Sequence, residues 1–136
     1  MDKKYEILEH PAELRLKIYG KTLEELFSNA AEAMADTLAT SDKRQAQKTE
    51  KENLKIQSVD TNSLLVDFLS EILAKSQINK CVYCVSKLKT QNSKLEAKLL
   101  GFSVDHFDED IKAVTYQDLN IQKIDDTWQT VLVFDI

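Results

Sequence analysis

Residues 14–27 read LRLKIYGKTLEELF, and this stretch predicts a strand, a turn and the start of a helix. Apolar residues alternate with basic ones over residues 14–19, which is typical of a strand with one buried and one solvated face. Gly20 ends this strand. Thr22 is a favourable helix N-cap, and Glu25, three residues later, would complete a capping box. We therefore expect the chain to pass from a half-buried strand directly into a helix.

The helix after this turn is predicted to be amphipathic, and so is a second helix later in the chain. Apolar side chains recur in both at i, i+3 and i+4 spacing. They are Leu23, Leu26, Phe27, Ala30, Met34 and Leu38 in the first helix, and Leu64, Leu65, Phe68, Leu69, Ile72 and Leu73 in the second. Asp60 or Thr61 would cap the second helix, which would end near Asn79. Each helix therefore has one apolar face to bury.

Strands are predicted wherever short runs alternate between apolar and polar residues or are continuously apolar. These runs lie at residues 5–8, 54–59, 81–89, 94–102, 113–116, 119–124 and 128–134. Residues 90–93 would form the loop of a β-hairpin, and Asp125 with Asp126 would make the last turn. Residues 41–53 are polar and lack a period, so we expect a loop there, part of which could extend the next strand.

These elements predict an α+β fold in a single domain over residues 1–136. Because most of the strands alternate, one face of the sheet should be solvated, which favours antiparallel pairing. We expect a two-layer sandwich with two amphipathic helices on one face of a largely antiparallel, mixed sheet of about six or seven strands.

The composition indicates a globular chain, with 43% hydrophobic and 30% charged residues among 136. No apolar run is long enough to span a membrane and the first residues do not resemble a signal peptide, so we expect no membrane association and a cytoplasmic location. The net charge of −5 arises within residues 105–126, where seven acids face two bases. The remaining 16 acids and 16 bases cancel. This acidic stretch would repel RNA phosphates, unless it is only a solvated loop.

Three kinds of site are disfavoured by the sequence. Cys81 and Cys84 form a lone C-x-x-C without the second pair that a structural zinc site needs, and their strand position favours buried, reduced thiols on opposite faces. With two glycines and one proline in the chain, no glycine-rich phosphate loop exists. The two histidines, His10 and His106, do not form part of a recognisable nucleophile–base motif.

A cation site is conceivable where the ends of two strands meet. Glu13 begins the second predicted strand, and Asp135 and Ile136 directly follow the last one. Hard cations bind several carboxylate and carbonyl oxygens, which these residues could supply if the two strands were neighbours. His10 could then support Glu13 from the preceding turn. Alternatively, Glu13 is a solvated carboxylate and His10 a turn residue that bonds to nearby backbone.

Four blocks of the sequence resemble the archease family. They are HPAE at residues 10–13, YGKTLEELF at 19–27, KAVTY at 112–116 and VLVFDI at 131–136. The resemblance covers essentially the whole chain in length and in the order of elements. It implies a non-catalytic accessory protein that activates an RtcB-type tRNA-splicing ligase, by promoting its guanylylation and allowing multiple turnovers.

The resemblance also implies roles for particular residues. A divalent metal ion, Ca²⁺ or Mg²⁺, would be held by Glu13, Asp135 and Ile136. His10, Lys112 and Tyr116 would contact the partner ligase.

The chain departs from the family pattern at four positions, 11, 13, 15 and 117. The family motif His-Thr-Ala-Asp, followed by a small or apolar residue and Gly, reads His-Pro-Ala-Glu-Leu-Arg over residues 10–15. Glu13 keeps the charge of the family aspartate but reaches one methylene further. Pro11 stiffens the turn, and Gln117 follows Tyr116 where the family usually has histidine.

Three alternatives belong to other functional classes. The first is a chaperone-like protein-interaction module without an essential metal. The second is a small enzyme that uses Glu13 and Asp135 as paired carboxylates. The third is direct RNA binding through a sheet face that carries Arg15, Lys17, Lys55 and Lys98. Balanced charge outside the acidic stretch and the scarcity of aromatic residues disfavour the third, so no direct nucleic-acid binding is expected.

Overall fold

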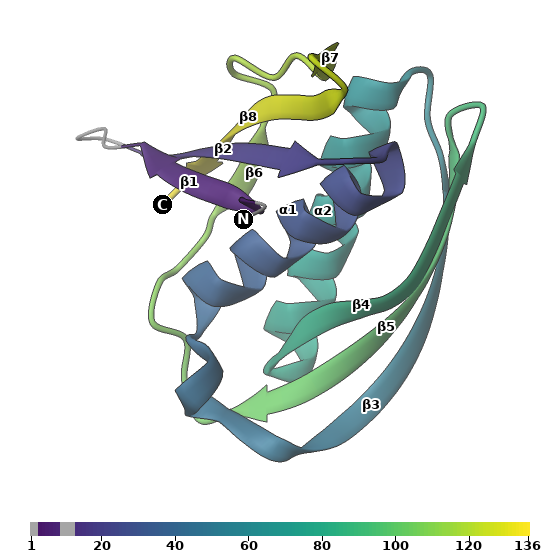
Figure 1. Ribbon diagram of the computed structural model, residues 1–136. Helices are drawn as coiled ribbons and strands as arrows, with labels where there is room; N and C mark the ends of the chain where they lie inside the picture. Colours follow the sequence, from purple (N-terminus) through teal and green to yellow (C-terminus); the bar gives the residue numbers. More distant parts are fainter. Residues whose placement is uncertain (1–2, 9–12) are drawn as a thin grey trace.

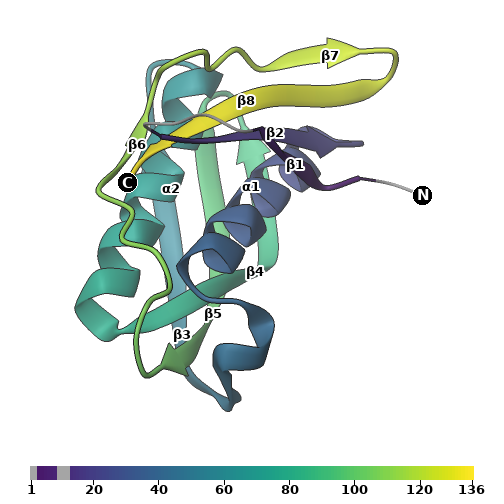
Figure 2. The same ribbon diagram turned by 90° about the vertical axis from the view of Figure 1, so that its left-hand side faces the viewer.

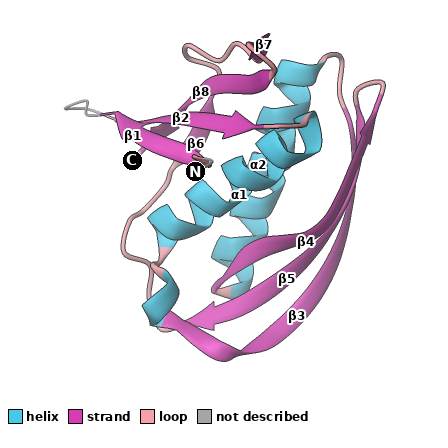
Figure 3. Ribbon diagram, in the orientation of Figure 1, coloured by secondary structure: helices cyan, strands magenta, loops and turns pink. Residues whose placement is uncertain are grey.

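The computed structural model describes residues 3–8 and 13–136 (Figure 1). The strands are β1 (Tyr5–Leu8), β2 (Leu14–Gly20), β3 (Arg44–Gln57), β4 (Cys81–Gln91), β5 (Lys94–Val104), β6 (Ala113–Thr115), β7 (Gln122–Ile124) and β8 (Thr127–Asp135). The helices are α1 (Leu23–Leu38) and α2 (Thr61–Asn79), with a short 3₁₀ turn at Ser41–Lys43. Figure 3 distinguishes the helices from the strands by colour.

The strands form two antiparallel sheets instead of the single sheet expected from the sequence. One has the order β1-β2-β8-β6, with β7 also paired to β8, and the other has the order β3-β5-β4. Figures 1 and 2 show α1 and α2 between the two sheets. The predicted α+β class with antiparallel strands is confirmed. The single sheet was wrong, because helices with wide apolar faces can bury them against a sheet on either side.

The turn from β2 into α1 forms as the sequence predicts. The Glu25 backbone N–H donates to Thr22 Oγ1 at 3.0 Å, and Glu25 Oε1 accepts from the Lys21 backbone N–H at 3.3 Å. The box thus closes one residue earlier than in its usual form. Gly20 is required by packing, because a Cβ there would lie 2.4 Å from the Leu26 backbone nitrogen. The strand can therefore lie directly against the first turn of the helix.

Helix α2 begins and ends close to its predicted limits. Asp60 caps it by accepting from the Ser63 backbone N–H at 2.7 Å, and Lys80 terminates it with φ 53°. The two helices meet in the core, where the rings of Phe27 and Phe68 lie 5.9 Å apart between centroids. Both apolar stripes are buried except for the partly buried Leu23, so the helical periodicity identified the core correctly.

The segment predicted as a loop over residues 41–53 is instead mostly strand. After the 3₁₀ turn, β3 starts at Arg44 and pairs with β5. Backbone hydrogen bonds to β5 stabilise an extended conformation whatever the side chains are. Because β3 is an edge strand, exposed charges on it also hinder pairing with other chains. Its polar character therefore reflects its position at the edge.

Two tight turns carry left-handed backbone. The β4–β5 hairpin turns at Asn92 and Ser93, with φ 50° and 64°, so the four-residue loop expected there is two residues long. Asp125 and Asp126, with φ 49° and 64°, make the predicted turn between β7 and β8. Positive φ at both central residues is the pattern of two-residue hairpin turns, because their twist matches that of the strands.

Cys81 and Cys84 are both reduced, as expected. Cys81 is buried and Cys84 is partly buried beside Arg44, whose Nη1 lies 3.8 Å from the sulfur. Burial raises the pKa of the Cys84 thiol. Because both thiols are at least partly buried, neither has the exposed setting of a reactive thiolate, even though Cys84 lies beside the Arg44 guanidinium.

Among the described residues, no helix is long and apolar enough to cross a membrane.

Candidate functional site

Strand β8 lies between β2 and β6, so three strand ends meet at one corner of the larger sheet. Leu14 pairs with Phe134 across β2 and β8, and Ala113 pairs with Asp135 across β6 and β8. Glu13 precedes Leu14 and therefore stands beside Asp135. The neighbouring strands that a shared site required are thus present.

The side chains at this corner point away from the core. Leu16 and Phe134 are buried against the helices. Because side chains alternate between the faces of a strand, Glu13, Arg15 and Asp135 lie on the opposite, outer face. The outer face of the larger sheet thus brings two carboxylates and a guanidinium together.

Glu13 is engaged by two neighbouring donors. Gln117 Nε2 donates to Glu13 Oε1 at 3.2 Å, and Arg15 Nη1 lies 3.6 Å from the same oxygen. Arg15 Nη1 also contacts Asp118 Oδ2 at 2.6 Å. We call Glu13, Arg15, Gln117, Asp118 and Asp135 the carboxylate corner.

The Arg15 guanidinium is the central cation of this corner. Its hydrogen bond with Asp118 is the main cause of a raised pKa, and the nearby charges of Asp118 and Glu13 act in the same direction. The side chains of Glu13 and Arg15 are only 16% and 20% exposed, whereas that of Asp118 is 52% exposed. Arg15 is therefore held in place by carboxylates on two different segments.

The corner fits a hard cation in part. Oxygen donors from neighbouring strands are the ligands that Ca²⁺ and Mg²⁺ prefer. However, the described residues contain no group of three or more His, Cys, Asp or Glu side chains arranged to hold a metal ion. Arg15 already places a positive charge beside Glu13. A divalent ion would therefore compete with this guanidinium for the Glu13 carboxylate.

The remaining predicted site residues flank the corner. The Lys112 backbone N–H donates to the Asp135 carbonyl oxygen at 2.7 Å, and the Lys112 side chain is exposed. Tyr116 and Ile136 are large exposed hydrophobic residues, 57% and 36% accessible. His10 lies outside the described residues. All of the described candidates therefore gather near the end of β8.

The comparisons with known proteins agree with this architecture. The model of the archease protein family matches residues 5–136. The chain belongs to the archease family. An archease from Methanosarcina mazei is 36% identical, over 98% of this chain and 97% of that protein. One from Pyrococcus abyssi is 34% identical, over 98% and 99%.

Two solved structures have the same fold. The solution structure of protein 1598 from Methanobacterium thermoautotrophicum has a TM-score of 0.78 at 25% identity, covering 98% of this chain and 99% of that one. The crystal structure of a Thermotoga maritima archease, described as a possible chaperone, has a TM-score of 0.71 at 20% identity and covers 100% and 98%. The archease fold therefore extends over essentially the whole chain.

Sequence reasoning missed part of this archease corner. It treated Arg15 as a candidate RNA contact, Gln117 only as a departure from the family, and Asp118 only as one acid of the acidic stretch. Arg15 and Glu13 lie two residues apart on one strand, a spacing that already places them on the same face. The contacts with Gln117 and Asp118 depend on the fold, because those residues are more than one hundred positions away.

Proposed function

We propose that this archease is a non-catalytic accessory protein that activates an RtcB-type tRNA-splicing ligase. It would promote guanylylation of the ligase and allow multiple turnovers. The observation that carries the proposal is the family match over residues 5–136, combined with the gathering of Glu13, Asp135 and Lys112 at the end of β8. The family match by itself does not favour any particular surface, whereas this corner combines charged groups with exposed apolar side chains.

The residues around the corner are suited to protein docking. Tyr116 and Ile136 are exposed apolar side chains next to charged groups, and an aromatic anchor surrounded by polar residues is typical of binding hot spots. Lys112 and Asp135 would add charge-assisted contacts at the rim. Docking here would place the carboxylates of the corner against the mouth of the ligase active site.

A divalent metal ion is part of the proposal. Glu13, Asp135 and the main-chain oxygens of Ile136 would hold Ca²⁺ or Mg²⁺, with Arg15 as the competing internal cation. When bound, such an ion supplies positive charge that stabilises charge developing on phosphate oxygens. The role of this chain is to position its carboxylates, so the chemistry of guanylyl transfer stays with the ligase.

The proposal is tested by measuring covalent ligase–GMP formation. A cognate ligase, GTP and divalent metal are incubated with and without this protein, and labelled GMP on the ligase is followed over time. We expect faster guanylylation, more than one ligation per ligase molecule, and no ligation by this protein alone. Unchanged rates across a range of metal and protein concentrations would remove the activator function.

A second candidate is a chaperone-like interaction module without an essential metal. The contact between Arg15 and Glu13 favours it, because an internal cation already offsets part of the charge at the corner. Calorimetric titration with Ca²⁺ and Mg²⁺ separates the two candidates. Metal binding that is lost in Glu13→Gln supports the metal-dependent activator. A titration that releases or absorbs no heat of binding, together with suppressed aggregation of a client protein, supports the chaperone-like interaction module.

A further inference from the structure

The outer face of the smaller sheet carries a cluster of exposed lysines, and Glu96 is the acid that lies among them in the strand register. We call Lys55, Lys87, Lys89, Lys94 and Lys98 the lysine face. All five are exposed and lie on β3, β4 and β5, while the alternate residues Leu95, Ala97 and Leu99 of β5 are buried. Five bases and one acid leave a local charge of +4 on a chain whose net charge is −5.

The register shows which of these lysines have a partner. Glu96 lies between Lys55 and Lys89 on the neighbouring strands, and Lys55 Nζ is 3.7 Å from Glu96 Oε1. Lys87 stands directly opposite Lys98, whose other neighbour is Asn53. Like charges directly opposite each other destabilise a sheet. The Lys87–Lys98 pair therefore goes against the usual preference for cross-strand neighbours, and such departures are often found at functional surfaces.

A groove crosses the same lysines. It has a volume of about 340 Å³, and its polar lining comes from Asn53, Glu96 and four of the five lysines, all except Lys94. Along one strand, side chains on the same face repeat at about 6.7 Å, and neighbouring strands lie about 4.8 Å apart. The ammonium groups therefore surround a shallow channel from several sides.

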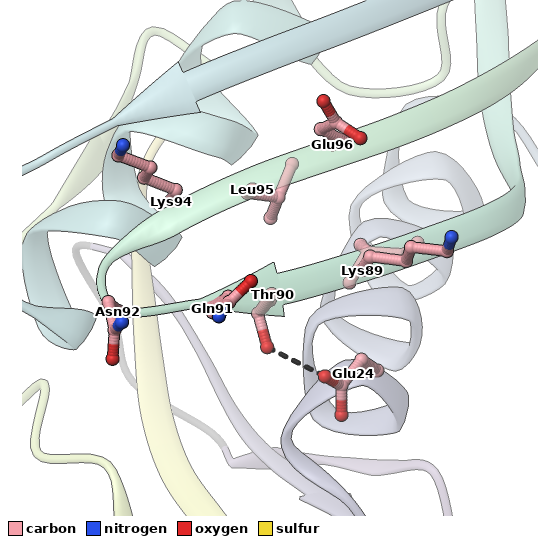
Figure 4. A pocket seen from close by; sticks show the side chains of 9 residues that line it. Glu24, Lys89, Thr90, Gln91, Asn92, Lys94, Leu95 and Glu96 are labelled. Carbon is pink, nitrogen blue, oxygen red and sulfur yellow. Dashed lines mark hydrogen bonds between the residues drawn. The ribbon is translucent and has the colours of Figure 1, made fainter.

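The hairpin that carries most of the lysine face is fastened to the body of the protein. Thr90 Oγ1 donates to Glu24 Oε2 at 2.7 Å, which joins the end of β4 to the first turn of α1 (Figure 4). This hydrogen bond is the main cause of the lowered pKa of Glu24. In Figure 4, Lys89, Lys94 and Glu96 extend from the ribbon of the same hairpin. The lysines therefore lie on strands whose hairpin is hydrogen-bonded to α1.

We propose that the lysine face binds the phosphate backbone of RNA without reading its sequence. Lysine contacts to phosphates supply essentially all of the energy of non-specific nucleic-acid binding. No aromatic side chain belongs to the lysine face or its groove, so base stacking is not provided. An acidic protein fits less well, because lysine is depleted in protein interfaces and the groove has no aromatic anchor.

The choice of RNA over DNA rests on the proposed function, since an activator of an RNA ligase works next to RNA. The inference replaces the expectation of no nucleic-acid contact, which relied on charge counted along the sequence. It also separates the four residues suggested for RNA contact. Lys55 and Lys98 belong to the lysine face, whereas Arg15 and Lys17 lie on β2 in the other sheet.

The test measures binding of a labelled oligouridine to the protein alone, by fluorescence anisotropy over a range of salt concentrations. Each phosphate contact to a single strand contributes about 0.7 to the slope of log K against log salt. Lys87→Gln/Lys98→Gln should therefore weaken binding at every salt concentration and lower the slope by about 1.4. Lys3→Gln/Lys123→Gln removes the same charge elsewhere and should keep the slope of the unaltered protein.

Several results would overturn the inference. One is an equal slope of log K against log salt for Lys87→Gln/Lys98→Gln and for the control. Another is tighter binding of labelled polyglutamate than of oligouridine, which would assign the face to an acidic protein. Thermal unfolding checks that each variant folds, and Lys55→Gln/Lys89→Gln provides an independent pair on the same groove. The binding assay contains no ligase, so it tests the lysine face independently of the proposed function. If RNA does not bind but the ligase is still stimulated, only the RNA-binding proposal fails. If RNA binds but the ligase is not stimulated, only the activator function fails.

Discussion

The carboxylate corner and the lysine face lie on the outer faces of two different sheets, and they handle charge in opposite ways. At the corner, Arg15 contacts Asp118 at 2.6 Å and Glu13 at 3.6 Å, so opposite charges meet within the protein. On the lysine face, Lys87 lies opposite Lys98, and Glu96 is the one acid among five lysines. Opposite charges are paired at the corner before any partner arrives, whereas most of the positive charge of the lysine face is not offset.

This difference shows that the net charge of −5 describes neither surface. At physiological ionic strength the screening length is about 8 Å, so each region acts mainly on what touches it. One protein can therefore present carboxylates to a metal ion or a protein and ammonium groups to phosphate. The two surfaces can be altered separately, and the following experiments use that property in order of decreasing expected effect.

The largest effect is expected from removing a carboxylate of the corner. Asp135→Asn keeps the size and main-chain hydrogen bonding of the residue but removes its charge. If the corner contacts the ligase, stimulation of ligase–GMP formation should fall to the rate of the ligase alone. The measurement is the initial rate of GMP transfer at saturating GTP.

Glu71→Gln is the matched control for that loss. Glu71 is an exposed carboxylate on α2 that does not belong to the carboxylate corner. It should leave stimulation intact, with an unfolding temperature equal to that of the unaltered protein. A ligase that responds equally to both variants would show that Asp135 has no role in activation.

A smaller effect is expected from removing the internal cation of the corner. Arg15→Gln takes away the guanidinium beside Glu13, so a divalent ion no longer competes with it. Ca²⁺ should then bind tighter by about fivefold, the upper range for one partly exposed ion pair. Calorimetric titration of the apo protein measures this affinity.

Lys17→Gln tests whether any lost cation would have the same effect. Lys17 lies on the same face of β2, two residues beyond Arg15, and its Nζ is 5.6 Å from the centroid of the Tyr19 ring. It does not contact Glu13, so Ca²⁺ affinity should change less than in Arg15→Gln. Equal affinities in all three proteins would show that Arg15 does not compete with a metal ion.

The elements with strong periodicity could be predicted from the sequence, because their pattern reports burial directly. Both helices, the caps at Thr22 and Asp60, and the turn at Asp125 follow from local residues. The first part of β3, over residues 44–53, could not be predicted, since its conformation depends on pairing with β5 about fifty residues later. The division into two sheets was missed for the same reason, because periodicity does not specify which strands pair.

The candidate site divides along the same line. Glu13 and Asp135 were identified from strand ends and from the family resemblance, and the pairing of β2 with β8 brings them together. The contacts of Arg15 with Asp118 and of Gln117 with Glu13 join distant segments and required the fold. The lysine face was hidden because its members alternate with other residues on three strands, so no charge run marks it in the sequence.

A modest gain in stability is expected from neutralising the like-charged pair of the lysine face. Lys87→Gln removes the repulsion between Lys87 and Lys98, which should raise the free energy of unfolding by about 0.3 kcal/mol. Chemical denaturation at low salt measures the change, and added salt should shrink it. Lys123→Gln, on β7 beside Trp128, is the control and should show no such salt-dependent gain. A loss of stability in Lys87→Gln would mean that the pair is not repulsive.

The smallest effect concerns an acid that is already paired, Asp108 in the acidic stretch. Its carboxylate contacts Lys43 Nζ at 2.6 Å and accepts from the Thr40 backbone N–H at 3.3 Å. The hydrogen bond with Lys43 is the main cause of its lowered pKa. A lowered folded pKa means that the unfolded chain binds the proton more readily. This contact therefore stabilises the fold above the unfolded value of about 3.9, and its contribution is lost as the pH falls through the lower folded pKa.

Asp108→Asn isolates that contribution, because the amide keeps the shape of the side chain but does not titrate. The unaltered protein should be slightly more stable than Asp108→Asn near neutral pH. This difference should begin to shrink near pH 4 and vanish once the pH is below the lowered folded pKa of Asp108. Thermal unfolding at a series of pH values measures both. Asp110→Asn, an exposed neighbour in the same stretch, controls for the loss of one charge. If the two variants showed the same dependence of stability on pH, the acidic stretch would act only through its summed charge. Its acids would then be unpaired like most of the bases of the lysine face, and the two regions would differ only in the sign of their charge.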